Sequence, residues 1–197
     1  MRYPPNQKKT SHERVLSEAS RMFRERGYRG TGVGAVMRAS GMTAGGFYAH
    51  FSSKESLFLE SLPMAFRDFR KRLRAGARRR SASPDELIRD YFDAQIEDPG
   101  AGCPIPALAA DAARSSSAVR RTFERELQET AAAFAARLPG AKDESGGTAL
   151  ALMALGAGGV LLSRAVENRE LADSILEACR RWAILEDPTY RAGVFPR

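Results

Sequence analysis

The chain contains few of the residues that form cross-links, metal sites or active sites. Its 197 residues include only two cysteines and two histidines. Cys103 and Cys179 are too few for a disulfide framework and lack the spacing of metal ligands. His12 and His50 both lie in the basic N-terminal part, with no nearby pattern that indicates a nucleophile or a metal. We therefore predict that the protein is not an enzyme and has no metal and no cofactor; an enzyme built on the helical part is the less favoured alternative.

Long hydrophobic runs are also missing. The longest apolar run, residues 149–162, has 14 residues and includes three glycines, whereas a membrane-spanning helix needs about 20 apolar residues. Residues 1–10 are polar and basic with two prolines, unlike a secretory signal. We therefore expect a cytoplasmic protein with no membrane partner, in which residues 149–162 form a buried helix.

The N-terminal part has the apolar spacing of a helix-turn-helix. Apolar residues recur at helical intervals over residues 11–26, and Gly27 predicts a left-handed stop. A second, short helical pattern begins at Val33 and ends where Gly41 permits a turn. This arrangement is typical of proteins that bind DNA.

A third helical pattern follows the turn. Thr43 is expected to cap this helix, and Phe47 and Phe51, four residues apart, are expected to point inward. Residues 52–55 have the capping-box spacing, which predicts the start of a long fourth helix. Pro63 lies inside that helix and removes one backbone hydrogen bond, so we expect a kink or a break there.

The remaining chain predicts further helices and no strands. Residues 98–106 are rich in proline and glycine and predict a loop, and residues 139–147 predict a linker. No segment alternates with a period of two for long enough to form a strand, so the predicted class is all-α. The later helices are expected from Ser83 or Asp85 to residue 97, and over residues 107–114, 118–138, 148–168 and 170–185.

The net charge of +7 is unevenly distributed. Residues 1–80 contain 18 Lys and Arg against 6 Asp and Glu, while residues 81–197 contain 13 against 18. Basic surfaces are common on solvated helices, so this asymmetry alone identifies no partner. Because the basic part coincides with the helix-turn-helix pattern, it favours contact with DNA phosphates.

Residues 12–60, followed by about 130 residues of helical pattern, resemble the TetR family of transcriptional regulators. The resemblance implies a three-helix DNA-binding head with a helix-turn-helix over residues 8–55. It also implies a larger helical domain for effector binding and dimerisation over residues 56–187, and residues 188–197 are expected to form an irregular tail. The matching residues are Thr31, Gly41, Phe47-Tyr48-Ala49-His50-Phe51 and Lys54-Glu55-Ser56-Leu57.

The resemblance also implies which residues contact double-stranded DNA. The expected phosphate contacts are Tyr48, His50 and Lys54, with Thr31 and Gly32 beside the DNA backbone. The alternative for Tyr48 is packing against the first helix, and the alternative for His50 is a helix-end cap. The residues expected nearest the base edges are Thr43, Ala44, Gly45 and Gly46.

Direct base readout in this third helix is sparse. A good bidentate base contact is worth about 1–3 kcal/mol of discrimination, and no Arg, Asn or Gln lies between residues 42 and 50 to make one. We therefore predict that specificity depends on a thymine methyl contact by Ala44, on close backbone approach at Gly45 and Gly46, and on DNA shape. Arg38 could reach a phosphate or a base; the alternative is a solvated side chain.

The last two helical patterns suggest a homodimer through residues 148–185. Gly156, Gly158 and Gly159 each cost about 0.5–1 kcal/mol inside a helix, a loss that close approach of another helix would offset. A two-fold dimer predicts a palindromic operator. The alternative is that these glycines pack against the chain's own core.

A small-molecule effector is the remaining predicted partner. The function that these expectations favour is a sequence-specific repressor released from its operator by a small hydrophobic ligand; the alternative is an architectural nucleic-acid-binding protein without an effector. The apolar side chains predicted to bind this ligand recur at helical spacing and could instead form a plain core. Cys103 could sense an oxidant or an electrophile, although an inert thiol is favoured. The predicted ligand-binding residues are Phe69, Tyr91, Phe92, Gln95, Phe123, Leu127, Phe134 and Met153.

Overall fold

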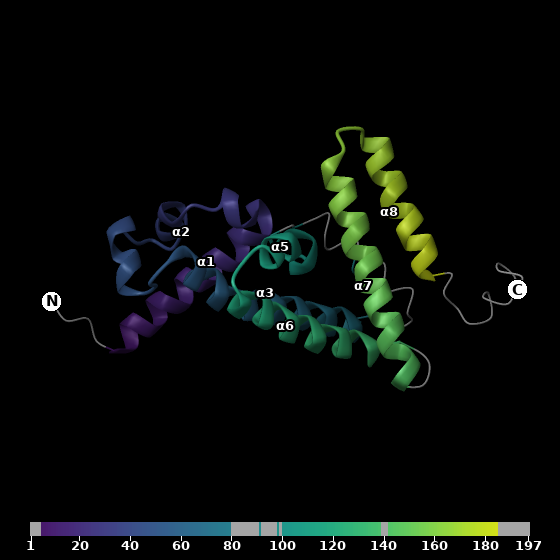
Figure 1. Ribbon diagram of the computed structural model, residues 1–197, viewed down its shortest axis with the longest axis horizontal. Helices are drawn as coiled ribbons and strands as arrows, with labels where there is room; N and C mark the ends of the chain where they lie inside the picture. Colours follow the sequence, from purple (N-terminus) through teal and green to yellow (C-terminus); the bar gives the residue numbers. More distant parts are fainter. Residues whose placement is uncertain (1–4, 80–90, 92–97, 99, 139–141, 185–197) are drawn as a thin grey trace, which may run out of the picture. The chain divides into compact units, whose positions relative to one another are not determined.

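The computed structural model describes residues 5–79, 91, 98, 100–138 and 142–184 (Figure 1). Within these ranges the chain is helical and contains no strand, which confirms the predicted all-α class. Most of the predicted helix over residues 85–97 and the predicted tail lie outside the described residues. The elements are α1 (Pro5–Gly30), α2 (Val33–Ala39), the 3₁₀ helix η1 (Ala44–Ala49), α3 (Lys54–Arg79), α5 (Pro104–Ala113), α6 (Ser117–Ala135), α7 (Lys142–Ala165) and α8 (Arg169–Ile184).

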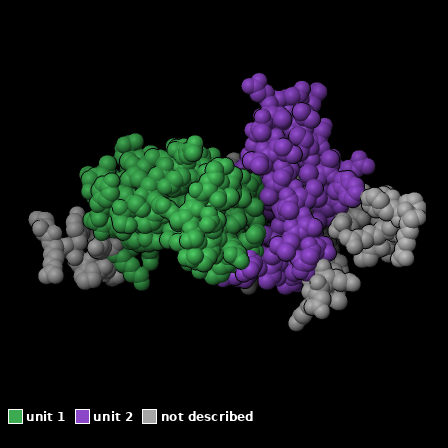
Figure 2. Space-filling model, in the orientation of Figure 1, with its two compact units in different colours: residues 1–69, 98–127 green, residues 70–97, 128–197 purple. Residues whose placement is uncertain are grey.

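The chain forms two compact units, shown in green and purple in Figure 2. The first unit contains residues 1–69 and 98–127, and the second contains residues 70–97 and 128–197. The first unit therefore includes the predicted DNA-binding residues together with α5, which packs against α1. The predicted boundary between the DNA-binding domain and the effector-binding domain, between residues 55 and 56, divides the chain by function and not by compactness, so it stays a prediction.

The core of the first unit is built on one face of α1. Val15, Ala19, Met22 and Phe23 are all buried, as the apolar spacing of residues 11–26 predicts. Gly27 has φ 70° and ψ 175°, so the regular helix geometry is interrupted where the stop is expected. The other members of this core are Val36, Met37, Phe47, Phe51, Leu57, Phe58, Leu62, Leu108, Ala112 and Val119.

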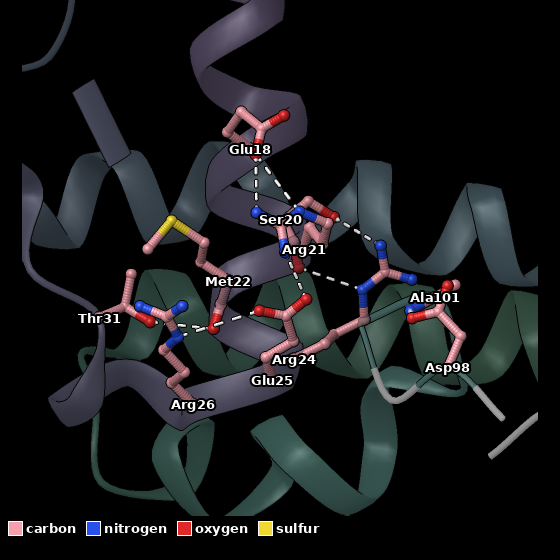
Figure 3. A network of polar contacts seen from close by, with 10 residues as sticks. All are labelled: Glu18, Ser20, Arg21, Met22, Arg24, Glu25, Arg26, Thr31, Asp98 and Ala101. Carbon is pink, nitrogen blue, oxygen red and sulfur yellow. Dashed lines mark hydrogen bonds and ion pairs between the residues drawn. The ribbon is translucent and has the colours of Figure 1, made fainter. Parts of the chain in front are cut away.

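The segment before α5 is fastened to α1. The buried guanidinium of Arg24 donates to the Ser20 carbonyl at 3.1 Å and to the Gly102 carbonyl at 3.3 Å. A Cβ at Gly100 would lie 2.6 Å from Oε1 of Glu25, so a larger residue here would require the Glu25 side chain to shift. Figure 3 shows the same part of α1, where Arg21 pairs with carboxylates of its own helix.

Two predicted helix starts need correction. α5 begins at Pro104 rather than at residue 107. Proline has no backbone N–H to donate, but the first turn of a helix needs none, because its N–H groups have no partner within the helix. α7 begins at Lys142, so residues 142–147 are helical although we predicted a linker there. Gly146 and Gly147 lower helix propensity, but propensity is a weak guide when a long segment is otherwise helical.

The second unit is organised around the pairing of α7 with α8. Arg70 lies in the part of α3 that belongs to this unit. It donates to Thr130 Oγ1 at 3.1 Å and pairs with Glu129 at 3.0 Å, which joins α3 to α6. Residues 149–162 form a helix as predicted, but only one face is buried: Met153 is 4% exposed and Leu162 is 57% exposed. Gly146–Ala165 could cross a membrane by length and composition alone, which is weak evidence because core helices share these properties.

Candidate nucleic-acid interface

The turn between α2 and η1 has the geometry of a glycine-terminated helix end. Gly41 has φ 71°, and its amide donates to the Arg38 carbonyl at 3.0 Å. The Met42 amide donates to the Met37 carbonyl at 2.9 Å, which completes a Schellman motif. The predicted turn at Gly41 is therefore confirmed, and its geometry fixes how the chain leaves α2 and enters η1.

The third helix of the head is a short 3₁₀ helix rather than an α-helix. Thr43 occupies its N-cap position, but its hydroxyl makes no capping hydrogen bond, so the predicted side-chain cap is wrong. Phe47 and Phe51 are buried as predicted, and their rings stack at 5.6 Å. Because this helix has three residues per turn, Gly45 and Tyr48 share its exposed face.

The residues predicted to be nearest the base edges present little side chain to solvent. Thr43, Ala44 and Gly45 are exposed, and Gly46 is partly buried. A Cβ at Gly45 would meet none of the described atoms within 4 Å, whereas one at Gly46 would lie 3.7 Å from Met37 Cε. The backbone of this segment can therefore be approached closely at Gly45.

Tyr48 and His50 extend this exposed surface. Tyr48 is 79% exposed, and its ring meets the adjacent Phe47 edge-on at 5.2 Å, so the alternative of packing on the first helix is disfavoured. His50 does end η1, because its amide donates to the Phe47 carbonyl at 2.9 Å. This backbone cap leaves the phosphate role of the imidazole as a prediction.

Sequence reasoning assigned no role to His12, which lies next to His50. The two imidazole centroids are 6.0 Å apart, and His12 also stacks on Phe51 at 4.5 Å. His12 Nε2 lies 2.9 Å from Glu60 Oε2, so α1 and α3 are joined beside the same surface. No local spacing indicates this cluster, because its members come from three separate segments.

Thr31 and Gly32 lie at the entry to α2. Thr31 is 1% exposed, and its hydroxyl approaches the carbonyl oxygens of Met22 at 3.0 Å and Gly27 at 2.8 Å. The structure thus gives this hydroxyl a role inside the head, closing the turn from α1 to α2. Gly32 is exposed and occupies the N-cap of α2.

Lys54 begins α3 and is positioned by Tyr28. Its Nζ lies 4.4 Å from the centroid of the Tyr28 ring, a cation–π contact. Burial lowers the pKa of the Lys54 amine, while the charge of Asp111 acts in the opposite direction. Burial also raises the pKa of the Tyr28 phenol, and the charges of Glu55 and Asp111 add to that rise.

The capping box that begins α3 is shifted by one residue from the prediction. Ser53 Oγ accepts from the Ser56 amide at 3.0 Å, and Ser56 Oγ accepts from the Ser53 amide at 3.1 Å. Ser52 and Glu55 therefore do not form the box. Glu55 instead accepts from the amide of Ser116 at 3.3 Å, which joins α3 to the segment between α5 and α6.

The predicted ligand-binding residues fall in both units. In the first unit, Phe69 is buried, and Phe123 meets Phe66 edge-on at 5.3 Å. In the second unit, Tyr91, Phe134 and Met153 are buried. Leu127 is partly buried in the first unit, while Phe92 and Gln95 lie outside the described residues. Among the described residues, no group of three or more His, Cys, Asp or Glu side chains could hold a metal ion.

Comparisons with known proteins agree with this geometry. The family model described as bacterial regulatory proteins, tetR family, matches residues 15–61. The HTH-type transcriptional regulator LmrA of Bacillus subtilis is 28% identical over 80% of this chain and 88% of its own length. The HTH-type transcriptional repressor DhaR of a Mycobacterium species is 29% identical over 59% of this chain and 60% of its own length.

A solved structure extends the likeness to both units. A TetR transcriptional regulator of Chloroflexus aurantiacus is 25% identical and has a TM-score of 0.68, and the match covers 91% of this chain and 96% of that one. The family match lies on α1, α2, η1 and the start of α3, where the helix-turn-helix geometry is found. The chain therefore belongs to the TetR family of transcriptional regulators and binds DNA.

Proposed function

We propose that the protein is a repressor that binds a palindromic operator as a homodimer and is released by a small hydrophobic effector. The observation that carries the DNA-binding part is the exposed Tyr48 on η1, held by the buried Phe47 directly after the Schellman turn. This turn sets the angle between α2 and η1 that a helix-turn-helix needs. The repressor assignment is supported by the similarity to DhaR, which is a transcriptional repressor.

The proposed DNA contacts follow the exposed surface of the head. Tyr48, His50 and Lys54 bind phosphates, which position the head on the duplex without reading its sequence. In this proposal Thr31 acts by closing the turn before α2, and Gly32 lies beside the DNA backbone. The base edges face Thr43, Ala44, Gly45 and Gly46, where exposure of Ala44 and open space at Gly45 support a methyl contact and close backbone approach.

The proposed dimer uses residues 148–185. Supporting it are large apolar side chains that remain exposed on α7 and α8. Apolar surface of this kind marks an interaction site when it is contiguous. Gly156 does not support the dimer, because it accommodates Tyr91 of the same unit, whereas a Cβ at Gly158 would meet none of the described atoms within 4 Å. The exposed residues are Leu150, Leu161, Leu162, Leu171 and Trp182.

The proposed effector is apolar because the described residues predicted to bind it are aromatic or aliphatic, and Phe69, Tyr91, Phe134 and Met153 among them are buried. In this scheme residues 8–55 bind DNA and residues 56–187 bind the effector and the second subunit. Pro63 lies in α3, which continues through it, and is the proposed point where α3 responds to the effector. As a DNA-binding regulator, the protein is expected to act in the cytoplasm.

A gel-shift experiment tests the proposal. The full chain is titrated onto DNA flanking its own gene and onto a shuffled duplex of the same composition, over a series of salt concentrations and with a panel of hydrophobic ligands. Preference for the flanking DNA that one ligand abolishes is expected. Equal binding to both duplexes with a steep salt dependence, unaffected by any ligand, would instead favour the architectural alternative. Tyr48→Ala and Lys54→Ala serve as variants that should weaken binding to both duplexes.

A further inference from the structure

A carboxylate from α5 lies directly beneath the bend in α1. Gly27 interrupts the helix with φ 70°, and the following amide, of Tyr28, donates to Asp111 Oδ2 at 2.8 Å. A hydrogen bond from an amide to a carboxylate is stronger than one between neutral groups. Asp111 is 15% exposed, and a Cβ at Gly27 would lie 3.3 Å from the same oxygen. The carboxylate and the bend are therefore fitted closely to one another.

The ring of Tyr28, whose amide this carboxylate holds, contacts the side chain of Lys54. The Tyr28 ring lies 5.0 Å from the ring of Phe58 and 5.9 Å from that of Phe23, and Lys54 Nζ lies over its face. The position of the ammonium group thus depends on the position of the ring. The ring in turn depends on the Tyr28 backbone, which Asp111 holds.

Asp111 is itself fixed with respect to α1 by contacts at the start of α5. The buried Arg24 donates to the Gly102 carbonyl at 3.3 Å, and Gly100 packs against Glu25. Figure 3 shows Arg24 on α1 facing the segment that contains Ala101, just before α5. The helix that carries this carboxylate is therefore anchored to α1 by the segment directly before it.

We propose that Asp111 is a positioning residue for DNA binding, which holds Tyr28 and through its ring the ammonium of Lys54 where that ammonium contacts a DNA phosphate. This proposal rests on the proposed phosphate contact of Lys54. Asp111 does not contact DNA, and its negative charge alone would repel phosphates. Positioning and charge therefore predict effects of opposite sign when the carboxylate is removed.

Asp111→Ala and Asp111→Asn separate these two effects. Alanine removes both the charge and the acceptor, whereas asparagine removes the charge but keeps an oxygen for the Tyr28 amide. The binding of each full-length variant is measured by fluorescence anisotropy over a salt series. The probe is a fluorescein-labelled duplex isolated from a random library with the wild-type protein. Asp173→Asn, on an exposed position of α8, is the matched control for loss of one negative charge.

We expect Asp111→Ala to weaken binding and to reduce the slope of log K against log salt by about 0.9, the value for one lost phosphate contact. Lys54→Ala is expected to give the same reduction. Asp111→Asn should keep the wild-type slope and bind at least as tightly as the wild type. The double variant of Lys54→Ala with Asp111→Ala should bind no more weakly than the weaker single variant, because both remove one contact.

Three results would overturn the proposal. The first is tighter binding by both Asp111 variants with an unchanged slope, which assigns Asp111 a purely electrostatic effect. The second is additive losses in the double variant. If Asp111→Ala is unfolded by circular dichroism, Tyr28→Leu replaces it, because it removes the ring but keeps the amide bonded to Asp111; an unchanged slope for this variant is the third. Failure of the wild type to bind any duplex would instead overturn the proposed function itself.

Discussion

The ring of Tyr91 occupies the space that a side chain at Gly156 would need. A Cβ at Gly156 would lie 2.5 Å from Cε1 of Tyr91, and the ring is buried. The glycine in α7 therefore accommodates an aromatic ring of the same unit, which supports the alternative that it packs against the chain's own core. Gly158, two residues further on, has no such constraint, because a Cβ there would meet none of the described atoms within 4 Å.

Gly156→Ala is expected to destabilise the protein by about 1–3 kcal/mol, because overpacking a buried site forces neighbouring groups to shift. Gly147→Ala, also in α7, should stabilise it by about 0.5–1 kcal/mol, since a Cβ there would meet none of the described atoms within 4 Å and alanine has the higher helix propensity. Urea unfolding of both variants measures the difference. In a Tyr91→Leu background the cost of Gly156→Ala should fall; an equal cost in both backgrounds would show that Tyr91 is not its cause.

Gly41→Ala is expected to destabilise the head by about 1–2 kcal/mol, because Gly41 has φ 71° and other residues are strained in that region. Gly32→Ala is the matched control: Gly32 is also exposed beside α2, but its φ is −86° and none of the described atoms would meet its Cβ within 4 Å. Thermal unfolding is measured for both. Comparable losses in the two variants would contradict a specific role for the turn.

Features that depend on local spacing could be predicted from the sequence. The buried face of α1 and the turn at Gly41 follow from residues only a few positions apart, and the structure confirms both. The 3₁₀ geometry of η1 differs from the predicted α-helix, because the spacing of Phe47 and Phe51 satisfies an α-helix equally well. Here local hydrogen bonding decides between two helix types that share an apolar pattern.

Contacts between distant segments could not be predicted. Tyr28 and Asp111 are 83 residues apart, so no pattern along the chain pairs them. The buried hydroxyl of Thr31 illustrates the same limit, since a threonine at a helix start has the same sequence signature whether it faces DNA or its own backbone. The functional role of each side chain depends on packing that the spacing of residues does not encode.

We expect the phenol of Tyr28 to cause a loss of stability at alkaline pH. Burial raises the pKa of its phenol above the usual value of 10.0, so the unfolded chain loses the proton first. The stabilising contribution of the protonated phenol is complete below the pKa of the unfolded chain. It is lost as the pH rises through the higher pKa of the folded state. The lowered pKa of Lys54 acts with the opposite sign, because raising the pH removes the cost of its buried charge.

The contribution of Tyr28 is isolated by comparing the wild type with Tyr28→Phe. Urea unfolding at neutral pH and above about pH 10 should show a larger loss of stability in the wild type than in the variant. Lys54 is present in both proteins, so its opposing effect cancels to a first approximation. Equal losses in the two proteins would remove Tyr28 as the source.

Trp182→Glu is expected to weaken the proposed dimer. Trp182 is 57% exposed on α8, and a carboxylate buried in an apolar interface carries a large desolvation cost. Light scattering across a dilution series should show a lower mass than for the wild type at equal concentration. Tyr48→Glu is the control, because it places the same charge at an exposed aromatic of the head and should leave the mass unchanged. A wild-type chain that is monomeric at all concentrations would contradict the dimer.

The exposed surface of η1 predicts two kinds of effect on DNA binding. Tyr48→Phe removes only the hydroxyl of a side chain that is 79% exposed, so the fold should be unaffected. If that hydroxyl donates to a phosphate, its loss should weaken binding by about 1.5–3 kcal/mol, as for hydrogen bonds to charged groups, and should do so equally on all sequences. Anisotropy on the selected duplex and on a shuffled duplex measures both properties.

Unlike Tyr48→Phe, Ala44→Gly should change the base preference and not the general affinity for DNA. Removing one methyl group leaves the phosphate contacts intact, so affinity for shuffled DNA should remain the same, while the preference at a single base pair should relax. Selection from a random library, followed by sequencing, compares the variant with the wild type at every operator position. Unchanged preference throughout would exclude a thymine methyl contact by Ala44. Because no Arg, Asn or Gln lies between residues 42 and 50, selectivity would then depend on DNA shape and on backbone approach at Gly45.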